Sequence, residues 1–258
     1  MKEICDDLEA ETAELTGALA GIGEEQWRTD TPAEGWDVAE TIIHLGQADY
    51  AAWLAAGDPD GFARFKDDLA AGRADLADAA EADVRSMSGA ELLDWFGAER
   101  KRMIDLFRAL GPKDRIPWFG PDMGALSFAT ARLMETWAHG MDVYDTLGVT
   151  VEPTDRLRHV AHIGVGTRGW SYANRGLTPP DTPVRVELTS PGGELWTWGP
   201  QDATDTVEGT AYDFCMVATQ RRNLADTSLQ VTGDAATEWM AIAQAFAGPP
   251  TDTPAGRG

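Results

Sequence analysis

Helical periodicity through the first 147 residues of this 258-residue chain limits the folds open to it. Apolar residues recur there at three-, four- and seven-residue steps, which is typical of amphipathic helices. Asp37 and Ser88 are suited to cap the second and third of these helices, and Gly148 to end the last. The predicted helices span residues 2–21, 38–56, 88–110 and 125–147. Four such helices in succession predict a helical bundle.

After residue 150 the sequence pattern changes from helices alone to a mixture of strands and helices. Residues 184–188 alternate apolar and polar side chains, as a half-buried strand does, and a Pro-Gly-Gly turn leads to a return strand at 195–198. Further expected elements are a peripheral helical segment in 60–85, helices at 154–170 and 210–220, strands at 206–208 and 228–231, and a last helix from a cap at Asp234 to residue 247. The predicted fold class is therefore α+β, with a helical bundle in residues 1–150, a small α+β domain in 151–248 and a disordered tail in 249–258.

The last bundle helix carries Glu135 and His139 four residues apart, so both side chains leave the same helix face. Of the four histidines, only His44 lies on another predicted bundle helix. The three side chains together can bind a divalent metal and leave positions for water, as catalytic sites do, whereas a structural zinc usually has four protein ligands. A carboxylate and a histidine at this spacing also occur as a plain surface pair. Asp142 is a candidate acceptor for the other ring nitrogen of His139.

Charge and composition argue against several classes of protein. The 43 acidic and 21 basic side chains give a net charge of −22, which would repel a nucleic-acid backbone, so we expect no nucleic-acid partner. No apolar run is long enough to span a bilayer, and the first twenty residues lack the pattern of a signal peptide; we expect a cytoplasmic protein without a membrane partner. The two cysteines form no C-x-x-C pair for zinc or redox chemistry.

Two segments resemble a known family. Residues 35–45, Gly-Trp-Asp-Val-Ala-Glu-Thr-Ile-Ile-His-Leu, have a tryptophan eight residues before a helical histidine and resemble the histidine helix of DinB-like four-helix bundles. Residues 135–142, Glu-Thr-Trp-Ala-His-Gly-Met-Asp, resemble the corresponding helix of the mycothiol-dependent maleylpyruvate isomerase family. The resemblance implies that His44, Glu135 and His139 bind zinc or another divalent metal.

The carboxy-terminal part resembles the small sterol-carrier-like α+β domain of the same family, in residues 208–214, 218–222 and 231–234. An arginine of that domain helps to bind the substrate in the family, which implies this role for Arg221 or Arg222. Adjacent arginines after a helix can also serve only to neutralise its last carbonyls.

Residues 159–176 are distinctive and do not match the isomerase pattern, so the chain looks closer to an uncharacterised sister branch. This basic segment includes Arg168, a candidate for binding an anionic substrate. It also includes His159 and His162, a rival metal pair that the nearby arginines disfavour by charge repulsion.

The resemblance implies an enzyme whose metal keeps a low-molecular-weight thiol, mycothiol, as the nucleophilic thiolate. The thiol would add to a small electrophilic, carboxylate-bearing substrate, and the enzyme would be an isomerase or a thiol S-transferase. Two alternatives stay open: a zinc-dependent hydrolase that uses metal-bound water, and a non-catalytic carrier of a metal or small ligand. The sequence leaves open the substrate, the choice of metal, and whether the protein is a monomer or a small homo-oligomer.

Overall fold

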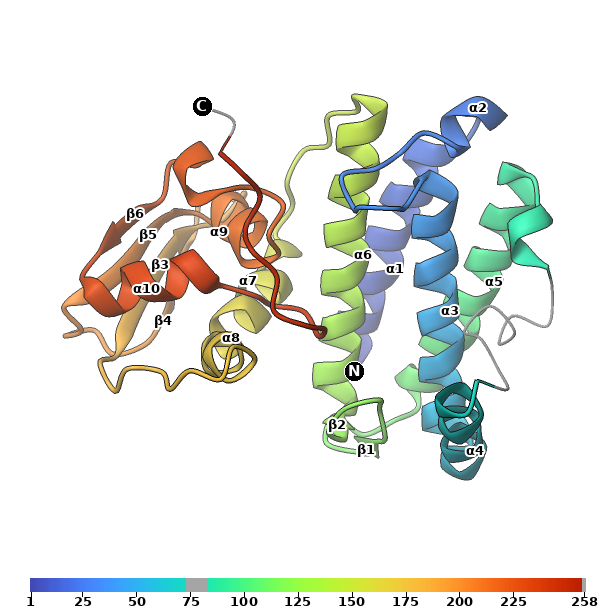
Figure 1. Cartoon of the computed structure of the whole chain (residues 1–258), viewed down its shortest axis with the longest axis horizontal. Helices are drawn as coiled ribbons and strands as arrows, with labels where there is room; N and C mark the ends of the chain where they lie inside the picture. Colours follow the sequence, from blue (N-terminus) through green and yellow to red (C-terminus); the bar gives the residue numbers. More distant parts are fainter. Residues whose placement is uncertain (73–82, 257–258) are drawn as a thin grey trace. The chain divides into compact units, whose positions relative to one another are not determined.

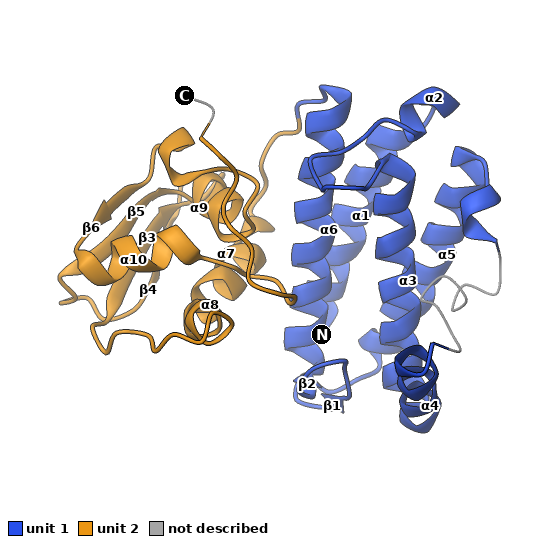
Figure 2. Cartoon of the chain, in the orientation of Figure 1, with its two compact units in different colours: residues 1–150 blue, residues 151–258 orange. Residues whose placement is uncertain are grey.

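The computed structural model describes residues 1–72 and 83–256, and the chain forms two compact units, Met1–Thr150 and Val151–Gly258 (Figures 1 and 2). The first unit is mostly helical and the second combines helices with a four-stranded sheet. This confirms the predicted α+β fold class. Within the described residues, no helix combines the length and the apolar character that crossing a membrane requires.

Long helices form the bundle of the first unit. Its elements are α1 Lys2–Leu19, α2 Glu24–Trp27, α3 Val38–Gly57, α4 Pro59–Ala70, a 3-10 helix Val84–Ser86, α5 Gly89–Arg108, β1 Arg115–Ile116, β2 Met123–Gly124 and α6 Ala125–Leu147. Helix α3 packs against α5 and α6, and α1 packs against α5 and α6, so the four long helices lie side by side (Figure 1). Their buried faces supply a core that includes Leu8, Ile42, Phe96, Phe107 and Phe128.

The helix ends of the bundle follow local signals in the sequence. The Asp37 side chain accepts a hydrogen bond from the Glu40 N–H at 2.8 Å, and Ser88 forms a reciprocal capping box with Glu91 at the start of α5. Gly148 ends α6 in the left-handed conformation, with φ at 65°. These caps confirm the predicted starts of α3 and α5 and the end of α6.

Two stretches of the first unit differ from, or extend, the prediction. The expected loop before α6 contains a small antiparallel ladder in which Arg115 of β1 pairs with Gly124 of β2. The expected peripheral segment 60–85 begins within α4, and its residues 73–82 lie outside the described part of the chain.

The second unit is built around one sheet with strand order β4-β3-β5-β6. Its elements are α7 Leu157–Gly166, α8 Arg168–Ala173, β3 Val184–Thr189, β4 Leu195–Trp198, β5 Asp205–Thr210, α9 Ala211–Ala218, a 3-10 helix Leu224–Asp226, β6 Gln230–Thr232 and α10 Asp234–Ile242. Strands β3 and β4 form the predicted antiparallel hairpin, whereas β3 and β5 run parallel, with Val186 opposite Val207. Helix α9 contacts β3 and β5, and α10 contacts β5 and β6, and the side chains of Val186 and Val207 are fully buried.

The predicted single helix at 154–170 is wrong, because the chain forms two helices that meet at Thr167. The Thr167 hydroxyl donates to the carbonyls of Ile163 at 2.8 Å and Gly164 at 3.1 Å. Side chains that bond to preceding carbonyls in this way compete with the regular helical ladder. Glycines in the same stretch further lower its helix propensity.

The predicted cap at Asp234 is also wrong. Gly233 is the residue that precedes α10, and the carboxylate of Asp205 on β5 accepts hydrogen bonds from the N–H groups of Ala235 at 2.8 Å and Ala236 at 3.3 Å. Gly233 has φ at 89°, and a Cβ there would lie 2.3 Å from the Asp205 carboxyl carbon. Only glycine lets the strand carboxylate approach this helix end so closely.

Residues 249–256 form no helix or strand, and the final two residues lie outside the described part. Carbonyls in this tail accept hydrogen bonds from the second unit, that of Thr251 from Gln220 at 3.1 Å and that of Pro254 from Asn223 at 2.8 Å. Disorder of the tail stays a prediction.

Candidate metal centre

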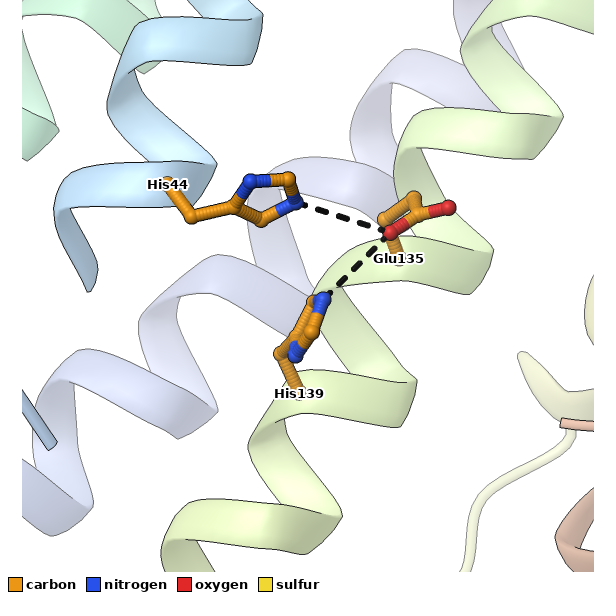
Figure 3. A group of neighbouring side chains, drawn as sticks. All are labelled: His44, Glu135 and His139. Carbon is orange, nitrogen blue, oxygen red and sulfur yellow. Dashed lines mark ion pairs between the residues drawn. The ribbon is translucent and has the colours of Figure 1, made fainter. Parts of the chain in front are cut away.

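Helices α3 and α6 bring His44, Glu135 and His139 together inside the first unit (Figure 3). The Nε2 atom of His44 lies 3.8 Å from Oε2 of Glu135, and the Nε2 atom of His139 lies 3.5 Å from the same oxygen. One donor atom from each residue lies within 4.8 Å of the other two. In residues 1–72 and 83–256, no second group of three histidine, cysteine or acidic side chains comes this close together.

Trp36 forms one wall of the cluster. Its ring centroid is 4.7 Å from that of His44 and 5.4 Å from that of His139, onto which it stacks. A tight loop holds it there: the Thr31 N–H donates to the Trp36 carbonyl at 2.8 Å, and Gly35 adopts φ of 80°. The tryptophan-to-histidine spacing noticed in the sequence therefore corresponds to direct ring contact.

Asp142 orients the imidazole of His139. Its Oδ2 atom lies 3.2 Å from Nδ1 of His139, and the residue is only 4% exposed. A proton held on Nδ1 by this carboxylate leaves the Nε2 lone pair directed at the cluster, which is the arrangement usual for metal-binding histidines. The hydrogen bond predicted for Asp142 is therefore present.

The surroundings favour the protonation states in which these side chains can bind a metal ion. Burial lowers the pKa of His44, and the charges of His139 and Arg132 add to this, against an opposing hydrogen bond that Glu135 accepts from the protonated ring. Burial alone would raise the pKa of Glu135, but hydrogen bonds from the protonated rings of His139 and His44, and the charges of protonated His139 and of Arg132, hold that pKa well below its ordinary value. At neutral pH the cluster thus offers a neutral imidazole on α3 and an ionised carboxylate on α6.

A buried ionic network adjoins the cluster. Asp49 of α3 accepts from the Nε atom of Arg100 at 2.5 Å and from that of Arg132 at 3.0 Å, and the three residues are 0%, 2% and 4% exposed. These residues were not predicted from the sequence as part of a site. The available signal was the presence of charged residues within the apolar stripes of three helices, where an unpaired charge would be costly.

The arginines predicted to bind the substrate all lie in the second unit, where each bonds to backbone carbonyls. Arg221 donates to Thr219 at 2.7 Å, and Arg222 donates to the Arg221 carbonyl at 2.8 Å. Arg168 on α8 donates to Pro180 at 3.3 Å and Thr182 at 3.0 Å, which fixes the segment before β3. The substrate role of these arginines stays a prediction.

The two histidines of α7 do not form a comparable cluster with other potential ligands in the described residues. The Nδ1 atom of His162 accepts a hydrogen bond from Nε1 of Trp198 on β4 at 3.3 Å. This contact ties α7 to the β3–β4 hairpin and gives His162 a structural partner.

Solved structures of a known enzyme share this fold. A crystal structure of the mycothiol-dependent maleylpyruvate isomerase matches with a TM-score of 0.54 at 14% sequence identity, covering 90% of this chain and 92% of that chain. A histidine-to-alanine variant of that enzyme matches with a TM-score of 0.55 at 14% identity, covering 91% and 93%.

Sequence comparison gives nearer relatives. Two uncharacterized proteins of Mycobacterium tuberculosis, from strains CDC 1551 / Oshkosh and H37Rv, are each 45% identical over 244 residues, which covers 95% of this chain and 95% of theirs. A family described as "Wyosine base formation" matches residues 180–230. The family described as "Mycothiol maleylpyruvate isomerase N-terminal domain" matches residues 8–144, more than half of the chain and all three residues of the cluster. The chain therefore belongs to the mycothiol maleylpyruvate isomerase N-terminal domain family.

Proposed function

We propose that this protein is a divalent-metal enzyme, with zinc as the expected ion, that uses mycothiol to isomerise a small electrophilic substrate or to transfer the thiol to it. The observation that carries the proposal is the convergence of His44, Glu135 and His139 from two helices. Two imidazoles and one carboxylate leave coordination positions for a thiol or substrate, as catalytic sites require.

The separations in the cluster suit a single ion. Two donor atoms that each bind one zinc ion at roughly 2.0–2.2 Å lie no more than about 4.4 Å apart. The separations of Glu135 from His44, 3.8 Å, and from His139, 3.5 Å, fall within that limit. All three donor atoms lie within 4.8 Å of one another, so the donor set and its geometry both support the proposal.

The residues around the cluster have separate tasks in this proposal. His44, Glu135 and His139 would hold the ion, and Asp142 keeps the proton on the Nδ1 atom of His139. A bound divalent ion supplies positive charge that keeps a small thiol deprotonated at neutral pH. The Trp36 ring lies against both imidazoles and would limit the access of water from that side.

The substrate would carry a carboxylate, for which Arg221, Arg222 and Arg168 are the candidate partners. A guanidinium group binds a carboxylate through two parallel hydrogen bonds. The names of the structural neighbours support this class of substrate, because maleylpyruvate is a small unsaturated acid.

Metal analysis tests the proposal first. The purified chain should contain about one equivalent of divalent metal, and His44→Ala and Glu135→Ala should each lose it because two ligands hold an ion far less tightly than three. Asp145→Ala, which removes an exposed carboxylate from α6, is the matched control and should keep the metal. Unchanged metal content in both ligand variants would refute the site.

A turnover assay then separates the reaction classes. The metal-loaded protein is incubated with maleylpyruvate in the presence and absence of mycothiol, and the isomer is measured. Isomerisation that needs the thiol supports the isomerase, and a stable thioether product supports the transferase. Hydrolysis of an ester or amide substrate without thiol would instead favour the hydrolase.

A further inference from the structure

We propose that Arg132 is the positioning residue of the metal centre, fixing α6 against α3 so that Glu135 and His139 meet His44. The inference rests on the proposed metal site. Arg132 lies one turn before Glu135 on α6, and it is 4% exposed. Its side chain therefore acts within the bundle, from the helix that supplies two of the three ligands.

The contacts of Arg132 reach α3 at two successive turns. The Nη2 atom donates to the carbonyl of Leu45 at 3.2 Å, and Leu45 directly follows His44. The Nε atom bonds Asp49, four residues further along α3, at 3.0 Å. Because the guanidinium is planar and rigid, two bonds to two turns resist both sliding and rotation of α3 against α6.

Even a small slide of α6 along α3 would misalign the cluster, so a contact that prevents the slide matters. A slide of one residue along a helix moves a side chain by about 1.5 Å. Metal and catalytic groups need to be held to within about 0.5 Å. His44 belongs to one helix and its two partners to another, so the cluster depends directly on how these helices are aligned.

Arg100 of α5 offers a matched comparison. It bonds the other oxygen of Asp49 at 2.5 Å, and it also bonds the hydroxyls of Thr12 at 2.5 Å and Thr136 at 3.0 Å. None of these contacts holds the α3 backbone beside His44. Removing either arginine leaves Asp49 with one guanidinium partner, so neither variant buries that carboxylate unpaired.

The test compares Arg132→Met with Arg100→Met in the full chain, each stripped of metal and then titrated with Zn²⁺ by calorimetry. Arg132→Met should bind Zn²⁺ about tenfold or more weakly, the loss typical when the groups that orient metal ligands are removed. Its visible absorption spectrum with Co²⁺ should also change, because that spectrum reports the arrangement of the ligands. Arg100→Met should match the wild type in both measurements, even if it lowers the melting temperature by as much as Arg132→Met does.

Several outcomes would overturn the positioning role. Arg132→Met could bind Zn²⁺ as the wild type does with the same Co²⁺ spectrum, or it could lose no more affinity than Arg100→Met. If Arg132→Met does not fold, Arg132→Lys replaces it, since the ammonium keeps the charge beside Asp49 but lacks the fork that reaches both partners. Wild-type affinity in Arg132→Lys would then refute the inference. Absence of Zn²⁺ binding in the wild type, or unchanged binding in His44→Ala, would instead refute the metal centre itself.

Discussion

Asp142 determines which nitrogen of His139 faces the cluster. The carboxylate is buried and bonds Nδ1, so Nε2 is the nitrogen that approaches Glu135. A metal-binding imidazole whose other nitrogen is held in this way keeps its orientation and its basicity. In the proposed site, we therefore expect single residues outside the ligand set to contribute to metal affinity.

Replacing Asp142 should weaken metal binding. Asp142→Ala removes the acceptor of the Nδ1 proton, and we expect Zn²⁺ affinity to fall by about 10- to 100-fold, as measured by competition with a chelating dye. Asp145→Ala on the same helix, an exposed position, should bind like the wild type. Equal affinities in the two variants would show that the hydrogen bond to His139 has no role in binding.

Acid should destabilise the metal-free protein through His44. Burial lowers its pKa below the ordinary 6.5, so between that value and the folded-state pKa the unfolded chain binds more protons than the folded one. Stability contributed by neutral His44 is thus complete above 6.5 and is lost as pH falls below it. Glu135, whose pKa lies well below 4.5, acts in the same direction at lower pH.

The measurement is the melting temperature as a function of pH for the metal-free wild type and His44→Gln. Glutamine does not titrate, so the variant should lose less stability on acidification below pH 6.5. Parallel curves for the two proteins would contradict this origin of the pH dependence.

Among the elements of the second unit, α7 is closely packed against α9. A Cβ added at Gly164 would lie 2.9 Å from the Phe214 ring and 3.1 Å from the Ala218 methyl, distances shorter than packed carbons normally allow. This glycine lets the two helices approach. The packing explains why a residue with poor helix propensity lies inside α7.

Gly164→Ala should therefore destabilise the protein by about 1–3 kcal/mol, the usual cost of overpacking, in urea unfolding followed by circular dichroism. The control is Gly166→Ala in the same helix, where nothing lies within 4 Å of the added methyl. We expect that change to be neutral or to stabilise by up to about 1 kcal/mol. A Gly164→Ala protein as stable as Gly166→Ala would mean that α7 shifts freely against α9.

Features encoded within a few residues were predictable from the sequence, and features that depend on distant partners were not. The caps at Asp37 and Ser88 need only the next three residues, so the starts of α3 and α5 could be read directly. The cap of α10 comes from Asp205, some thirty residues earlier on β5, whereas the local sequence pattern predicts Asp234. The helix periodicity predicted that Glu135 and His139 share a face, but which side chains steady them depends on contacts between helices.

For the whole molecule, the division into two units has a direct consequence for the proposed metal centre. The three cluster residues, together with Trp36 and Asp142, all belong to Met1–Thr150. The predicted substrate arginines all belong to Val151–Gly258. Metal binding and substrate binding are therefore assigned to different units in our proposal.

A protein comprising residues 1–150 should bind Zn²⁺ with the affinity of the full chain, because every residue that contacts the cluster in our account is present. Bound metal should stabilise it by about 2.7 kcal/mol when free Zn²⁺ is 100 times the dissociation constant. Calorimetry and thermal melts with and without Zn²⁺ measure both quantities, with His44→Ala in the same fragment as the control. A folded fragment that binds Zn²⁺ much more weakly than the full chain would mean that residues beyond 150 contribute to the site.

The contact of Trp36 with His44 and His139 makes its fluorescence a reporter of the cluster. Indole emission is quenched by a protonated imidazole in contact with the ring and responds to a metal ion bound nearby. Trp36 is one of ten tryptophans, so the difference between the wild type and Trp36→Phe isolates its signal. Changes at the cluster can then be followed in real time through the fluorescence of Trp36, which contacts both imidazole rings.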